Sequence, residues 1–123
     1  EMAKAIKDFD SAIELDPQFA NAYLNRAETK KTQGIFLEAL DDYNDAIRLE
    51  PTNARIYAGR GLLFLRMNRL DEAEKDIDLA VELGIPETAF LQTREDIKIQ
   101  RIGFQRALIS ETAATTSAVD IAK

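Results

Sequence analysis

Cysteine and histidine are both missing from the 123 residues of this chain. Without cysteine, the chain cannot form a disulfide, a thiolate nucleophile or a zinc site built on thiolates. Without histidine, it lacks the commonest general base and the commonest metal ligand in proteins. We therefore expect a chain without a metal or another cofactor.

Long apolar runs are also missing, and the charge is mainly of one sign. The chain carries 22 acidic and 16 basic residues, a net charge of −6. This balance argues against binding of a nucleic-acid backbone, which requires clustered Lys and Arg.

No run approaches the length of a membrane span, and no signal-peptide pattern opens the chain. We expect no membrane insertion and a cytoplasmic location. The chain begins inside a helical pattern, so we interpret it as a fragment.

Proline and glycine are scarce, with three and five residues respectively, which predicts short connections between regular elements. Between the connections, apolar residues recur at spacings of three and four, as on one face of an α-helix. Asp16-Pro17 and Glu50-Pro51 end two of these patterns, because the residue before a proline avoids helical geometry. Gly34 and Gly84 lie at further ends. The predicted helices cover residues 2–15, 20–33, 36–49, 54–67, 70–83 and 87–109.

The stretch 20–53 recurs along the chain at a spacing of 34 residues. Tyr23 matches Tyr57, Ala39 matches Ala73, and Pro51 matches Pro17. Self-similarity at one fixed spacing is typical of a solenoid of stacked structural repeats.

These residues resemble the tetratricopeptide repeat (TPR) family, whose unit is a helix-turn-helix of 34 residues. The resemblance implies an all-α superhelix of antiparallel helix pairs, ending in a long capping helix. On this basis we divide a TPR-like domain, 1–109, into the second helix of a truncated repeat, 1–19, two repeats, 20–53 and 54–87, and a capping helix, 88–109. Residues 110–123 form a tail that is either a weak helix or an extended segment.

The resemblance also implies a function, because the first helix of each repeat in this family lines a concave groove that binds a peptide. We therefore expect a protein-interaction module, a scaffold or adaptor similar to co-chaperones, and not an enzyme. Transferred to this chain, the groove comprises Asn21, Leu24, Asn25, Glu28, Arg55, Gly59, Leu62, Leu65, Arg66, Gln92 and Asp96. Neighbouring positions on the same helices are Ala58, Ala89 and Thr93.

One subclass of the family grips a C-terminal carboxylate with a clamp of Lys, Asn and Arg. Asn25 and Arg55 match two members of this clamp. Gly59, however, stands where the clamp has an arginine, so we expect no complete clamp. The remaining groove is mixed in character and suits a peptide or helix with some apolar anchors.

A second set of residues repeats every 34 positions and is charged. It consists of Arg26, Arg60 and Arg94 with Asp8, Asp42 and Asp76. All lie on or beside the apolar stripes, where a charge requires a partner. We predict a ladder in which each Arg pairs with an Asp of a neighbouring helix, since the planar guanidinium binds a carboxylate with two hydrogen bonds. The alternative is a row of arginines that binds acidic ligands.

Both ends of the chain carry apolar faces that need cover. The terminal helix has one seam at Phe90, Ile97, Phe104 and Leu108, and another at Leu91, Ile102 and Ile109. The tail, a second copy of the chain and another domain are the candidate partners. The first helix has an open face around Ala5 and Phe9. A homodimer or an exchange of helices between chains is therefore an alternative function.

Catalytic motifs are weak. The acidic string at 41–45 lacks the glycine and the distal glutamate of a calcium loop. Gly59-Arg60-Gly61 lies within a helix with no strand before it, unlike a nucleotide-binding loop. These glycines instead allow helices to approach closely or open the floor of the groove. A last alternative is that the chain is the regulatory arm of a larger enzyme.

Overall fold

The computed structural model describes the backbone of residues 1–122 and the side-chain surroundings of residues 1–115. Within that range every regular element is helical, so the predicted all-α class is confirmed. The helices begin and end within a residue or two of the predicted positions, except for the last. They are α1 (Met2–Leu15), α2 (Ala20–Thr32), α3 (Phe36–Leu49), α4 (Ala54–Arg66), α5 (Leu70–Glu82), the 3-10 helix η1 (Glu87–Phe90) and α6 (Leu91–Ala122).

Equivalent turns connect α2 to α3 and α4 to α5. Gly34 and Asn68, which are 34 residues apart, both adopt a positive φ, of 80° and 58°. Glycine and asparagine tolerate this left-handed conformation better than other residues. It allows the chain to reverse while the helix end stays hydrogen-bonded: the Arg69 amide donates to the Phe64 carbonyl at 2.8 Å, a bond that closes the last turn of α4.

Two tyrosines hold the proline turns onto the helices that follow them. The Tyr23 hydroxyl donates to the Pro17 carbonyl at 3.2 Å, and the Tyr57 hydroxyl donates to the Pro51 carbonyl at 2.6 Å. The rings themselves are buried in the core. The repeat therefore preserves both the apolar body of the tyrosine and its polar end.

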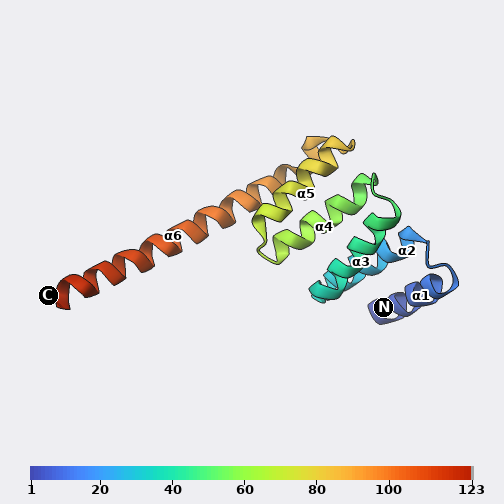
Figure 1. Cartoon of the computed structure of the whole chain (residues 1–123), viewed down its shortest axis with the longest axis horizontal. Coiled ribbons are helices and arrows are strands. Elements are labelled where there is room, and N and C mark those ends of the chain that lie inside the picture. The colour runs from blue at the N-terminus through green and yellow to red at the C-terminus, as the bar shows by residue number, and fades with distance from the viewer. Residues whose placement is uncertain (123) are drawn as a thin grey trace.

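Small residues set the distance between paired helices. Ala27, Ala39 and Ala73 are fully buried. A Cβ atom at Gly61 of α4 would lie 3.0 Å from Ile77 and 3.3 Å from the backbone oxygen of Ala73, both on α5. Each helix contacts its neighbour in sequence, and α2 also contacts α4. The helices thus stack in order along the body (Figure 1), and the contact between α2 and α4 makes these two first helices neighbours.

Helix α6 begins against the body and then leaves it. Thr93 and Ile97 are buried, whereas every residue from Ile102 to Thr115 is exposed. Figure 1 shows the distal part of α6 projecting away from the other helices. The helix does not end near residue 109 but continues to Ala122, so most of the tail is helical and cannot fold back over the seams of the same helix. No helix in the described part of the chain has the length and apolarity that a membrane crossing requires.

Candidate functional site

Polar side chains from α2 and α4 meet where these two helices lie adjacent. Glu28 of α2 and Arg55 of α4 form an ion pair with 3.7 Å between Oε2 and Nη2. One turn earlier on α2, the half-buried Asn25 borders a hollow of about 340 Å³ that Glu28 also lines, with Met2 and Phe9 of α1 on its far side. Asn25, Glu28 and Arg55 therefore form one continuous polar surface, which we call the α2–α4 surface.

At the other end of the same helices, Arg66 connects α4 to α2. Its Nη1 donates to the Lys31 carbonyl at 2.9 Å, and its guanidinium lies 5.0 Å from the centre of the Phe36 ring. Burial lowers the pKa of the Lys31 ammonium, and the positive charge of Arg66 lowers it further, while Glu28 opposes the shift. This end of the α2–α4 surface is therefore positively charged, but partly withdrawn from solvent.

Tyr43 of α3 lies beneath this surface. It is fully buried, and its hydroxyl has no hydrogen-bond partner among the described residues. Burial raises the pKa of this hydroxyl strongly, so it stays protonated at any ordinary pH. A Cβ atom at Gly59 would lie only 2.7 Å from the ring. Gly59 is buried and leaves room for the Tyr43 ring, which agrees with the alternative that these glycines allow helices to approach closely.

Two other predicted groove residues belong to the core. The exposed fractions of Leu24 and Leu65 are 1% and 8%, so neither offers an apolar contact to a ligand. Leu62 is half-buried, and Asn21 is exposed. Gln92 and Asp96 hydrogen-bond to each other along α6, at 2.9 Å. Leu24 and Leu65 are buried because α2 and α4 each contact several helices at once, so the buried arc of each helix is wider than one apolar stripe.

The structure contains two rungs of the charge ladder. Arg26 holds the buried Asp42 through Nε and Nη2, at 2.8 and 2.7 Å. Arg60 holds the buried Asp76 in the same way, at 2.7 and 2.9 Å. The carboxylates raise the pKa of both guanidinium groups further above its ordinary value. Each pair joins the first helix of a repeat to the second.

The ends of the ladder differ from the prediction. Arg94 binds Glu87 of η1 at 2.6 Å and Asp78 of α5 at 2.8 Å, and neither acid belongs to the predicted set. In the repeat pattern its partner would be residue 110, but that position is a serine on α6 itself. Asp8 is exposed, and the third donor of Arg26 binds Asp10 instead, at 2.7 Å.

Sequence reasoning missed three residues that contribute to the α2–α4 surface or to the hollow beside it. Lys31 lies three residues, about one turn, after Glu28, and this spacing is the sequence signal that could have included it. Met2 and Phe9 line the hollow beside Asn25. No sequence signal could place them there, because the spacing within α1 does not reveal which part of α2 it contacts.

The geometry described so far defines a helical solenoid, in which antiparallel helix pairs of nearly equal length stack with a repeated ion pair and a repeated tyrosine–proline contact. Comparison with known families identifies the repeat. Residues 32–68 match the model described as TPR repeat, and residues 54–83 match the model described as tetratricopeptide repeat. Two models of this repeat therefore match within residues 32–83. No protein in the curated set matches this chain.

Solved structures share this fold. The type III secretion chaperone SycD of Yersinia enterocolitica, crystallised with a peptide of the translocator YopD, has a TM-score of 0.66 and 19% identity, with 86% of this chain and 81% of that one covered. The OM64 TPR domain of Arabidopsis has a TM-score of 0.66 and 24% identity, covering 86% and 82%. The TPR2B domain of yeast Sti1 in complex with pHsp70 has the same TM-score and identity, covering 85% and 84%.

Proposed function

We propose that this chain is a protein-interaction module, acting as a scaffold or adaptor, and that it binds a peptide or a helix on the α2–α4 surface. The observation that carries the proposal is the continuity of Asn25, Glu28 and Arg55 across two helices. A surface formed by two packed helices is rigid, so its polar groups are positioned before a ligand arrives. One of the solved structures with this fold contains a bound peptide, and another is a complex with pHsp70, which supports the same class of function.

The polar groups of this surface suit a peptide backbone as well as side chains. The amide of Asn25 can both donate and accept a hydrogen bond, which is what a backbone N–H and C=O require. Arg55 is exposed and shares only a long ion pair with Glu28, so it retains donors for a ligand. Leu62 is half-buried on the same helix as Arg55 and supplies an apolar contact. Because Leu24 and Leu65 are buried, the polar contacts discriminate more between ligands than the apolar ones do.

We predict that the double variant Asn25→Ala/Arg55→Ala loses its protein partners while keeping its fold. Truncating two central polar contacts is expected to weaken binding by about tenfold or more, equivalent to about 1.4 kcal/mol. The fold should persist, because an exposed ion pair such as Glu28–Arg55 contributes about 0–1 kcal/mol to stability. Affinity capture from cell extract, followed by quantitative mass spectrometry, measures the recovery of each partner.

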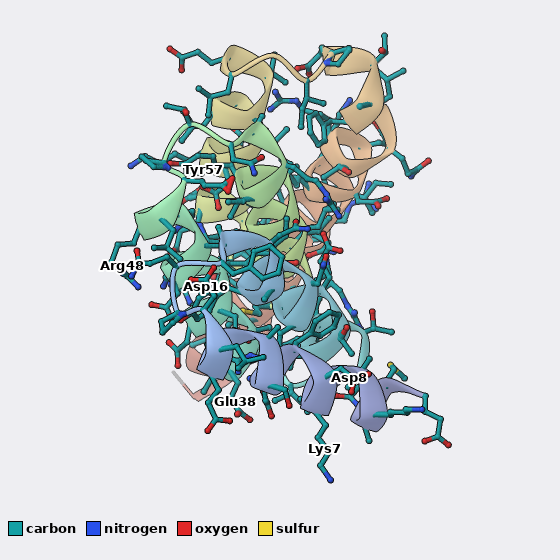
Figure 2. All side chains as sticks on the ribbon, turned by 90° about the vertical axis from the view of Figure 1, so that its right-hand side faces the viewer. Lys7, Asp8, Asp16, Glu38, Arg48 and Tyr57 are labelled. Atoms are coloured by element: carbon teal, nitrogen blue, oxygen red, sulfur yellow. The ribbon has the colours of Figure 1, made fainter. Side chains whose placement is uncertain are left out.

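A matched control removes an arginine and an amide away from the surface. Arg48 of α3 points outward into solvent in Figure 2, and Gln100 is exposed on α6. The variant Arg48→Ala/Gln100→Ala should recover the same partners as the original chain. If the Asn25→Ala/Arg55→Ala variant also recovers them undiminished, the assignment of the binding surface is wrong.

A second function, self-association, is favoured by the apolar residues of distal α6. The exposed fractions of Phe104, Leu108 and Ile109 are 59%, 46% and 68%. Large apolar side chains exposed together often mark an interface. A second copy of the chain would cover them by pairing the two α6 helices, or by an exchange of helices that places one α6 against the open face of α1 in the other chain.

We predict that, if this second function holds, light scattering over a concentration series shows the mass of two chains. The variant Phe104→Ser/Leu108→Ser should then shift the mass to that of one chain. A control variant, Leu37→Ser, removes an apolar side chain that is 71% exposed on α3 and should leave the dimer intact. A chain that stays monomeric at every concentration and still binds a peptide excludes self-association as the function.

A further inference from the structure

A second hollow, separate from the α2–α4 surface, lies between α3 and α5. It has a volume of about 370 Å³, and none of its lining residues comes from α2 or α6. Helix α4 forms its floor through Arg60 and Phe64, while α3 and α5 form its walls. We call it the α3–α5 groove. The proposed function makes no use of it.

Within the α3–α5 groove, the side-chain oxygens already accept hydrogen bonds from the arginines, whereas some N–H donors remain available to a ligand. Arg60 occupies both oxygens of Asp76, and its Nη1 donates to Oδ1 of Asn44 at 2.9 Å. Arg69 occupies both oxygens of Glu72, each at 2.7 Å. Because the amide oxygen of Asn44 is used, its NH₂ group remains available, and an NH₂ group only donates.

Three cations contribute to the groove, and two of them are held in place. The guanidinium carbons of Arg60 and Arg69 lie 5.6 and 4.8 Å from the centre of the Phe64 ring, within the range of cation–π attraction. The third, Lys75, is exposed and forms no ion pair with the described side chains. Its ammonium group therefore has all three donors available. Together with the amide of Asn44, Lys75 provides a place for an anionic group.

The preceding repeat shows that this charge is specific to one groove. The residues that line the α3–α5 groove comprise three cations and two carboxylates, a net charge of +1. The residues 34 positions earlier comprise two cations and five carboxylates, a net charge of −3. The exchanges responsible are Asp10 to Asn44, Lys30 to Phe64, Ile35 to Arg69, Asp41 to Lys75 and Asp45 to Leu79. A groove with net positive charge on a chain of net charge −6 will concentrate anions locally.

We infer that the α3–α5 groove binds an acidic segment of a partner peptide, with a carboxylate or phosphate group against Lys75 and Asn44. An adjacent apolar side chain of the segment packs against Leu40 and Leu79 on the two walls. The groove is open along its length, so a small molecule would remain largely in solvent. A segment of a longer chain suits it better, because the remainder of that chain can lie outside the groove.

The test uses the ¹⁵N-labelled chain titrated with three capped pentapeptides, Ala-Leu-X-Leu-Ala, in which X is glutamate, phosphoserine or glutamine. The glutamate or the phosphoserine peptide should shift the Lys75 backbone signal and the Asn44 side-chain signal in a saturable way. The glutamine peptide should bind about tenfold more weakly or not at all. The stronger of the two acidic peptides identifies the carboxylate or the phosphate as the source of the charge. Equal binding of the glutamine peptide would overturn the proposal.

The matched variants place charge in the groove or away from it. Asn44→Asp/Lys75→Asp introduces the residue types of the acidic groove one repeat earlier, and the new carboxylate at position 44 would still accept the hydrogen bond from Arg60. This variant should bind the acidic peptides about tenfold more weakly. Lys7→Asp/Gln18→Glu changes the net charge by the same amount at exposed positions, and Lys7 points away from the body in Figure 2. Its affinity should be unchanged, and an equal loss in both variants would show a general charge effect and refute the site.

This proposal and the α2–α4 function fail separately. The Asn25→Ala/Arg55→Ala variant should retain its affinity for the acidic pentapeptides, because it leaves the α3–α5 groove unaltered. If the acidic peptides instead shift signals on α2 and α4, and this variant abolishes their binding, the α3–α5 groove is not the site.

Discussion

Replacing Arg60 with Met is expected to lower the free energy of unfolding by about 3 kcal/mol, because the substitution leaves the carboxylate of Asp76 buried without its partner. Asp76 is 3% exposed, and both of its oxygens accept hydrogen bonds from Arg60. Methionine can fill the space of the arginine stem, so the lost stability will come mainly from the uncompensated charge. Urea unfolding followed by circular dichroism measures the change.

The first repeat provides an internal comparison for this prediction. Asp42 accepts two hydrogen bonds from Arg26, but it also lies 3.2 Å from the ammonium of Lys30. At the position equivalent to Lys30, the second repeat has Phe64, which carries no charge. Arg26→Met should therefore cost less stability than Arg60→Met, since Asp42 retains a cation.

A double variant separates the charge from the packing. Asp76→Asn removes the negative charge with almost no change of shape, so Arg60→Met/Asp76→Asn should recover part of the stability that Arg60→Met loses. An Arg60→Met variant as stable as the original chain would show that the ion pair has no structural role. A larger loss for Arg26→Met than for Arg60→Met would contradict the role assigned to Lys30.

Replacing Gly59 with Ala is expected to destabilise the chain by about 1–3 kcal/mol, although alanine is the better helix former. The new Cβ atom would lie 2.7 Å from the Tyr43 ring, closer than carbon atoms approach without displacement. Tyr43 is fully buried, so the ring has no free space into which it can move. Thermal unfolding of the variant should show a lower midpoint than that of the original chain.

Gly103 provides the matched control, because it also lies within a helix. A Cβ atom there would have no neighbour within 4 Å. Gly103→Ala should keep the stability of the chain or raise it by up to about 1 kcal/mol through helix propensity alone. If both alanine variants are stabilised alike, Tyr43 adapts without cost and the close contact at Gly59 does not constrain the helices.

The α2–α4 surface and the α3–α5 groove differ in how far the sequence alone could predict them. Asn25, Glu28 and Arg55 of the α2–α4 surface were expected from the sequence, because the resemblance to the repeat family places these three positions along one groove. The α3–α5 groove was not predicted, although the exchange of Asp10 for Asn44 and of Asp41 for Lys75 is visible in the printed sequence. These positions acquire meaning only when three helices bring them together around one space.

The sequence by itself determined the helices, the turns and the 34-residue repeat, because hydrophobic spacing, prolines and turn residues act over a few neighbouring positions. It also determined the two inner rungs of the ion-pair ladder, since equal repeats place Arg26 and Arg60 in equivalent surroundings. Only the tertiary structure decided what happens where the repetition ends. There Arg94 binds Glu87 and Asp78, and α6 continues beyond the body. It also decided that Gly59 is a packing position, because the distance between two helices depends on both surfaces in contact.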